Sequence, residues 1–166
     1  MYASRLNATG TYVANEYIQI SNNTGDFRGL SPYELSTSDN WVMEADIMQT
    51  NDSNRQYKGF YILRTDDSSR WSWLIQYSNS HVFYVKDTGT IATSQSGSSI
   101  NTWYHFKLQL ENGVFYYEVT DTSDNVLFSH TWTLDSYYQN KTIRAYIFAY
   151  DSSNTVRFKN VSVSKL

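Results

Sequence analysis

The last third of the chain constrains the fold most strongly, because it reads as successive β-hairpins with almost nothing helical between them. Residues 103–110 (WYHFKLQL) and 114–121 (VFYYEVTD) are strand-like segments joined by a turn that contains the Asn-Gly pair 112–113. Such a pair adopts the positive φ angles that a two-residue hairpin turn requires. The same arrangement follows twice more, with polar turns at 122–125 and 151–154. These hairpins predict an all-β fold, an antiparallel sandwich of two sheets.

Alternation with a period of two continues through the rest of the chain, and no segment has a convincing helical period. In residues 41–48 every second residue is apolar, and the opposite face carries Glu44 and Asp46. We expect about ten to twelve short strands, with the Ser-, Thr- and Gly-rich residues 88–101 forming a loop. The chain is expected to be a single domain, 1–166, that belongs to a longer polypeptide, because it ends abruptly at a strand.

Charge and composition exclude several functional classes. The net charge is −3 and the 13 basic residues are scattered, which excludes the concentrated positive charge that a nucleic-acid partner needs. No apolar run approaches the length of a membrane span. Cysteine is absent, so the core rather than disulfides must hold the fold. Aromatic residues make up 17% of the chain and include 15 tyrosines, a side chain that suits a pleated surface and keeps a polar tip.

Three segments together resemble the concanavalin A-like and laminin G-like jelly-roll superfamily. They are 41–47 (WVMEADI), 103–108 (WYHFKL) before a turn and a Tyr-rich strand, and the closing strand 156–163 with Phe158 and Asn160. The resemblance covers roughly residues 40–166 and concerns strands and aromatic positions rather than a chemical motif. It implies two facing antiparallel sheets, one of them concave. The superfamily includes lectins, carbohydrate-binding modules, adhesive domains, virus tail appendages and some glycoside hydrolases, so the implied setting is extracellular, at a cell surface or on a virion.

The hydrolases of this superfamily carry Glu-x-Asp-x-x-Glu on one strand, and this chain departs from that pattern. The matching residues are Glu44, Asp46 and Gln49, and an unbulged strand would offer Met48 instead. An amide cannot protonate a leaving oxygen, so we expect no catalysis, although Glu44 and Asp46 are retained as candidate groove-lining residues. The alternative is a solvated acidic strand face. No zinc-binding or nucleophile-elbow motif is present either.

Structural calcium is the one cofactor that the resemblance leaves open. Asp66 and Asp67 are the preferred candidate ligands, because hard cations bind carboxylate oxygens in loops. No EF-hand-like ladder is present. The alternative role for adjacent Asp residues is to cap a turn through their own side-chain hydrogen bonds.

Residues 143–150 carry more aromatic side chains than one core face needs. One face is aliphatic (Ile143, Ala145, Ile147, Ala149) and the other carries Arg144, Tyr146, Phe148 and Tyr150. If the aliphatic set is buried, the rings lie on an outer or concave surface, where they suit the apolar faces of sugars. The alternatives are that the rings fill the core and the alanines face out, or that a loop covers the rings. Tyr61 and Tyr116 are further candidates, whereas the stripe Trp71, Trp73, Ile75 and Tyr77 is expected in the core.

The sequence therefore predicts a non-catalytic recognition module that binds glycan on a cell surface or in a polysaccharide. Two alternatives stay open. One is a structural or receptor-binding domain of a virus tail fibre or surface adhesin, and the other is a degenerate glycoside hydrolase.

Overall fold

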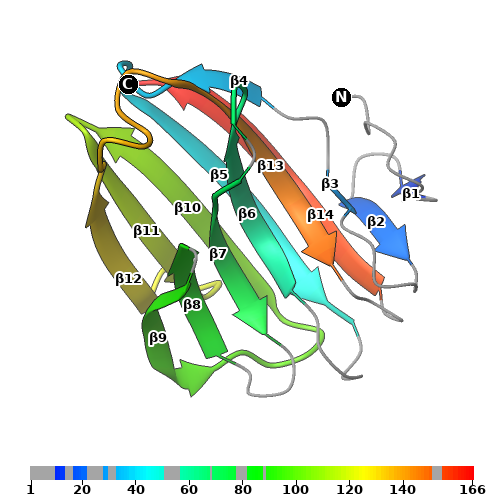
Figure 1. Ribbon diagram of the computed structural model, residues 1–166. Helices are drawn as coiled ribbons and strands as arrows, with labels where there is room; N and C mark the ends of the chain where they lie inside the picture. Colours follow the sequence, from blue (N-terminus) through cyan, green and yellow to red (C-terminus); the bar gives the residue numbers. More distant parts are fainter. Residues whose placement is uncertain are drawn as a thin grey trace.

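The computed structural model describes residues 10–13, 17–21, 28–29, 33–50, 57–67, 69–77, 82–87, 89–150 and 155–166. These residues form two antiparallel sheets that lie face to face (Figure 1). Sheet A has the strand order β1-β2-β14-β5-β10-β11-β12. Sheet B has the order β3-β13-β6-β7-β8-β9, and β4 also pairs with β13. The predicted two-sheet antiparallel sandwich is confirmed.

The strands of sheet A are β1 (Gly10–Val13), β2 (Tyr17–Ser21), β5 (Trp41–Gln49), β10 (Trp103–Glu111), β11 (Val114–Thr120), β12 (Val126–Thr133) and β14 (Thr155–Lys165). Those of sheet B are β3 (Arg28–Gly29), β4 (Tyr33–Ser36), β6 (Tyr57–Arg64), β7 (Trp71–Tyr77), β8 (Val82–Asp87), β9 (Gly89–Gly97) and β13 (Thr142–Tyr150). The loop expected at 88–101 is wrong in part, because β9 pairs with β8 along one edge of sheet B. Its Ser- and Thr-rich sequence has the composition of a loop, but an edge strand needs no second buried face. Within the described residues no helix is long and apolar enough to cross a membrane.

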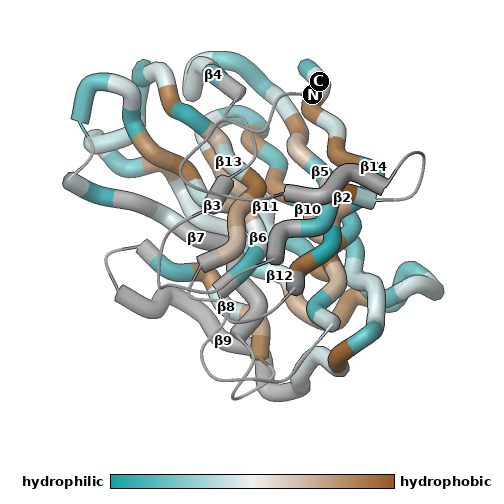
Figure 2. Tube along the Cα trace, turned by 90° about the vertical axis from the view of Figure 1, so that its right-hand side faces the viewer, coloured by the Kyte–Doolittle hydropathy of each residue, from teal (hydrophilic) through white to brown (hydrophobic). Residues whose placement is uncertain are grey.

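The core lies between the two sheets and is built from the inward residues of alternating strands. Along β10 buried and partly exposed residues alternate without interruption, and hydrophobic and hydrophilic positions alternate in the same way in Figure 2. Phe106 of sheet A meets Phe60 and Phe83 of sheet B edge to face, with ring centroids 6.3 and 6.0 Å apart. Such pairs stabilise the sandwich beyond their buried area.

The turn between β10 and β11 has the geometry that its sequence predicts. Asn112 and Gly113 have φ angles of 51° and 76°, both in the left-handed region. Glu111 then pairs directly with Val114, which fixes the register of the whole hairpin. A second irregularity lies in β14, where the register shifts between Lys159 and Ser162 and Asn160 has a φ of 50°. This is a β-bulge, which bends a strand and redirects a side chain.

Candidate functional site

Strand β13 buries its aliphatic residues and turns its polar and aromatic ones outward. Ile143, Ala145 and Ile147 are at most 1% exposed and belong to the core between the sheets. Arg144 is exposed and Tyr146 is partly exposed. Of the alternatives drawn from the sequence, the one that buries the aliphatic set between the sheets is therefore correct. The outer surface of sheet B carries Arg144 and Tyr146.

Three rings on this surface contact one another. Tyr61 of β6 pairs directly with Tyr146 of β13, and the two ring centroids are 5.9 Å apart. The ring of Phe148 also lies 5.9 Å from that of Tyr61. Burial is the main cause that raises the pKa of Tyr61 to about 12, and its electrostatic interaction with Tyr146 adds to it. The Tyr61 hydroxyl therefore stays protonated at neutral pH and can donate a hydrogen bond.

Phe148 was expected to contact the ligand, and the structure corrects this expectation. It lies on the outward face of β13, yet it is 0% exposed and is no part of the core between the sheets. A ligand cannot touch a sealed ring, so Phe148 packs beside Tyr61 instead and supports its position. The side chain of Tyr150, which pairs with Tyr57 in the register, lies outside the described part of the chain.

The tryptophan stripe of β7 was expected in the core, and the burial of its side chains lies outside the described part of the structure. In the register, Trp73 pairs with Tyr61 and Trp71 pairs with Leu63. The inward position between them is Ser72, which is 2% exposed. Its hydroxyl lies 3.4 Å from that of Tyr138, in the connection between β12 and β13. The serine can be buried because its hydroxyl has a hydrogen-bonding partner. That partner is distant in the sequence, so the local sequence pattern could not reveal it.

We call this surface the aromatic face and define it by the outward positions of β13, β6 and β7: Arg144, Tyr146, Phe148, Tyr61, Trp71 and Trp73. Arg144 Nε donates to Glu34 Oε1 at 3.1 Å, and both side chains are largely exposed. Sequence reasoning missed Tyr84 and Lys86, which extend the same face into β8 opposite Ile75 and Trp73. The sequence carries the signal for this, because Tyr84 and Lys86 alternate with the apolar residues Phe83 and Val85. In the structure Phe83 and Val85 are completely buried.

Glu44 and Asp46 lie on the other side of the molecule, which corrects the expectation that they join the aromatic residues in one site. Both face outward from β5 in sheet A, on either side of His105. Asp46 Oδ1 lies 2.8 Å from His105 Nδ1, and Asp46 Oδ2 accepts a hydrogen bond of 2.6 Å from Asn160 Nδ2. Glu44 Oε1 is 3.6 Å from His105 Nε2. Asp46 and His105, with Trp103, line a hollow of about 390 Å³.

The third position of the hydrolase pattern faces inward. Gln49 is 1% exposed, and its amide oxygen accepts a hydrogen bond from the ammonium group of Lys58, which is completely buried. Strand β5 pairs with β10 without a bulge from Trp41 to Met48. No register shift along this pairing therefore brings a third carboxylic acid of β5 beside Glu44 and Asp46 on the outer surface.

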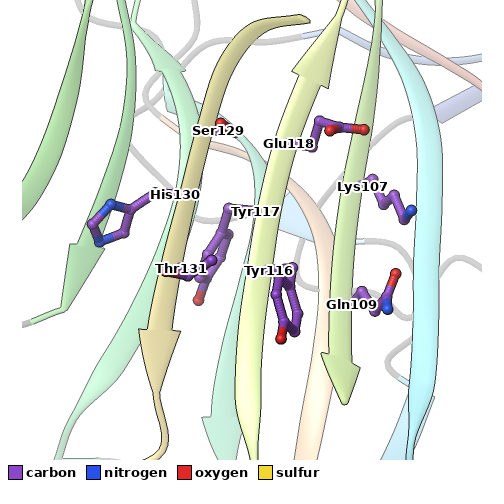
Figure 3. A pocket seen from close by; sticks show the side chains of 8 residues that line it. All are labelled: Lys107, Gln109, Tyr116, Tyr117, Glu118, Ser129, His130 and Thr131. Carbon is purple, nitrogen blue, oxygen red and sulfur yellow. The ribbon is translucent and has the colours of Figure 1, made fainter.

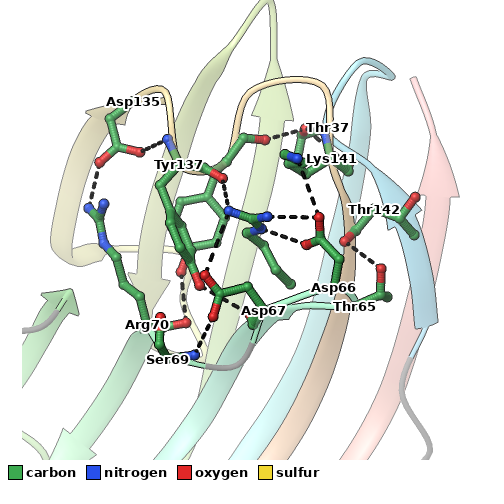
Figure 4. A network of polar contacts seen from close by, with 12 residues as sticks. Thr37, Thr65, Asp66, Asp67, Ser69, Arg70, Asp135, Tyr137, Lys141 and Thr142 are labelled. Carbon is green, nitrogen blue, oxygen red and sulfur yellow. Dashed lines mark hydrogen bonds and ion pairs between the residues drawn. The ribbon is translucent and has the colours of Figure 1, made fainter.

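The predicted calcium ligands Asp66 and Asp67 belong to a polar network between the β6–β7 turn and residues 135–141 (Figure 4). Arg64 donates to both carboxylate oxygens of Asp66 at 2.7 Å, and Lys141 lies 3.3 Å from one of them. The hydrogen bond from Arg64 is the main cause that lowers the pKa of Asp66 far below its usual range.

The same network engages Asp67. Its Oδ1 accepts the backbone N–H of Ser69 at 2.9 Å, the turn-capping alternative weighed from the sequence. Tyr137 donates to the backbone oxygen of Asp67 at 3.0 Å and stacks under the Arg64 guanidinium, 4.3 Å from ring centroid to Cζ. Within the described residues no three His, Cys, Asp or Glu side chains are grouped to hold a metal ion. The expectation of no resident cofactor, with structural calcium as its alternative, stays a prediction.

The two sheets and their strand order give the protein the fold of a concanavalin A-like jelly-roll sandwich. Among solved structures it is similar to the carbohydrate-binding module CBM66 from Bacillus subtilis, with 15% identity, a TM-score of 0.66 and coverage of 95% of this chain and 92% of that one. Lectin II from Ulex europaeus has 6% identity, a TM-score of 0.69 and coverage of 95% and 90%. A family 7 alginate lyase, A1-II′, has 9% identity, a TM-score of 0.67 and coverage of 95% and 83%. Neither a family model nor a curated protein sequence matches the chain. The jelly-roll resemblance seen in the sequence is confirmed at the level of fold.

Proposed function

We propose that this protein is a non-catalytic recognition module that binds a glycan on the aromatic face of sheet B. The observation that carries the proposal is the pair Tyr61 and Tyr146, whose rings stay partly exposed while Phe148 beside them is sealed. The core between the sheets is complete without these rings. Aromatic side chains that the core does not need, held in fixed positions on a sheet, are typical of a binding surface.

The chemistry of the face suits a sugar. The flat rings of Tyr61 and Tyr146 offer apolar surfaces to the C–H side of a pyranose or furanose ring. Arg144 and Glu34, joined at 3.1 Å, place guanidinium donors and carboxylate acceptors beside them for sugar hydroxyls. The protonated Tyr61 hydroxyl adds a donor. The fold is shared with a carbohydrate-binding module and a lectin, which supports the same assignment. A glycan partner of this kind goes with an extracellular, cell-surface or virion setting.

The absence of catalysis is part of the proposal. The two carboxylates of the hydrolase pattern, Glu44 and Asp46, lie on the outer face of sheet A, away from the aromatic face. Asp46 is engaged by His105 and Asn160, and the position of the third acid is a buried glutamine. The third carboxylic acid of the hydrolase pattern is therefore missing beside these two carboxylates.

The test is a glycan array followed by titration of the best glycan against four variants: Tyr61→Ala, Tyr146→Ala, the double variant, and Val126→Ala as a control. Val126 is 56% exposed on β12, at the far edge of sheet A. Each aromatic variant should bind about tenfold more weakly or worse, because a central aromatic contact is worth about 1.4 kcal/mol or more. The control should bind like the wild type. Unchanged affinity in the double variant would remove the aromatic face from the function.

The same glycans also test the absence of catalysis. We expect no release of reducing ends or unsaturated products on prolonged incubation. Product formation that disappears with Glu44→Gln would instead establish the glycosidase alternative.

A further inference from the structure

A second hollow lies on the outer face of sheet A, across β10, β11 and β12 (Figure 3). Its volume is about 530 Å³, within the range of small-molecule sites. The side chains that point out of the sheet into it come from alternate residues of three neighbouring strands: Lys107, Gln109, Tyr116, Glu118, Ser129 and Thr131. This surface faces away from the aromatic face, since the core lies between them.

Three rings line this hollow, those of Tyr116, Tyr117 and His130, and Tyr116 is the large ring that is well exposed, at 39%. Its cross-strand partners are Gln109 on β10 and Thr131 on β12, neither of which has a ring to cover it. The neighbouring Tyr117 is 2% exposed and belongs to the core, so the register of β11 holds Tyr116 firmly on the surface. The ring face is therefore available and well positioned.

The polar groups around Tyr116 are also available. Within the described part of the chain, the side chains of Lys107, Glu118, Ser129 and Thr131 make no hydrogen bond or ion pair. Gln109 donates its amide N–H to Glu111 Oε2 at 2.9 Å, which orients the amide group. The hollow around Asp46 differs, because Asp46 there is already held by His105 and Asn160. Donors and acceptors that converge on a ring without partners of their own can bind a ligand rich in hydroxyl groups.

The charges of the hollow indicate which ligand it suits. Lys107 and Glu118 are a directly paired cation and anion, so the charged lining residues sum to zero. An anionic glycan would meet Glu118 as well as Lys107, whereas a neutral sugar can accept from one and donate to the other. One ring among polar side chains is too little apolar surface for the centre of a protein interface.

We propose that the Tyr116 hollow is a second carbohydrate site, which binds a neutral oligosaccharide with one sugar ring stacked on Tyr116. Gln109, Lys107 and Glu118 bind its hydroxyls. The site is separate from the aromatic face and points in the opposite direction, so one molecule can bridge two glycan chains. With two such sites the protein cross-links glycan chains as well as recognising them.

Backbone-amide NMR titration of the intact chain tests this site separately from the aromatic face. The probes are neutral tetrasaccharides: maltotetraose, cellotetraose, mannotetraose and fructotetraose. We expect one of them to shift amides of residues 107–118 and 129–131, with about tenfold or greater weakening in Tyr116→Ala. Tyr116→Phe should show the same amide shifts as the wild type, because it keeps the ring. Tyr61→Ala with Tyr146→Ala should leave them unchanged.

Four results are distinguishable. Shifts around Tyr61 and Tyr146 alone would support the aromatic face and overturn the second site. Shifts around Tyr116 alone would support the second site and remove the aromatic face. Shifts in neither region, with every probe, would overturn the second site, as would shifts at 107–118 that Tyr116→Ala leaves intact. The melting temperature of Tyr116→Ala is measured as a control. A value close to that of the wild type shows that the variant is folded, so that a loss of binding is not caused by unfolding.

Discussion

Replacing Phe148 by alanine tests whether the aromatic face rests on a sealed ring. Phe148 is 0% exposed although it faces away from the core between the sheets, and its ring lies 5.9 Å from that of Tyr61. Removing a completely buried phenylalanine costs about 3–5 kcal/mol, because transfer and cavity terms add. That is a large fraction of the about 5–15 kcal/mol that stabilises an ordinary domain.

The expected change in melting temperature follows from the size of the chain. Unfolding entropy of about 2.1 cal/mol/K per residue gives about 0.35 kcal/mol per kelvin for 166 residues. Phe148→Ala should therefore lower the melting temperature by about 9–14 °C. The measurement is thermal unfolding followed by circular dichroism, with urea unfolding as a second method.

Two further variants make the result specific to Phe148. Tyr116→Ala removes a ring that is 39% exposed, so its melting temperature should fall by no more than about 2 °C. Phe148→Leu should keep most of the stability and allow glycan affinity to be compared at full folding. A fall of less than about 3 °C for Phe148→Ala, or about 1 kcal/mol, would show that its ring is not sealed and would refute the reasoning.

Three other predictions concern single groups. Gly113→Ala should cost about 1–2 kcal/mol in urea unfolding, because a φ of 76° strains an L side chain even though no atom lies within 4 Å of the new Cβ; no loss of stability would contradict the assigned turn. The lowered pKa of Asp66 means that its bond to Arg64 contributes stability above the unfolded pKa of about 3.9, which is lost as the pH falls through the folded value. Asp66→Asn should therefore flatten the loss of stability on acidification below about pH 4, and an unchanged slope in pH-dependent unfolding would oppose this reading. Adding calcium chloride should not raise the melting temperature, since Arg64 and Lys141 already neutralise Asp66; a rise that a chelator reverses would establish a calcium site.

Strand β13 shows how much of the fold a local sequence pattern can predict. Its period of two identified the two faces, and the structure shows Ile143 inside and Arg144 outside. The pattern could not choose between the faces, because both were apolar enough to be buried. The choice depends on contacts from elsewhere in the chain, such as the pairing of Tyr146 with Tyr61.

The errors have the same origin in long-range pairing. In β7 the face that alternates with Trp71 and Trp73 looked polar and was expected outside, yet Ser72 on that face is buried beside Tyr138, which lies 66 residues away in sequence. Glu44 and Asp46 were grouped with the aromatic residues because a sequence does not show which sheet a strand joins. Strand β5 pairs with β10 and β14, and β13 pairs with β6, which places the two sets on opposite surfaces.

The position of β14 has a consequence for biosynthesis. This strand lies between β2 and β5, in the interior of sheet A, where Val163 pairs with Met43 and Val156 pairs with Ile20. The early strands therefore cannot complete their sheet on the ribosome until residues 155–165 have emerged from the exit tunnel. Such distant pairings also make folding slow, so the apolar strands of the nascent chain stay exposed until residues 155–165 can pair with them, and chaperone protection matters during that interval.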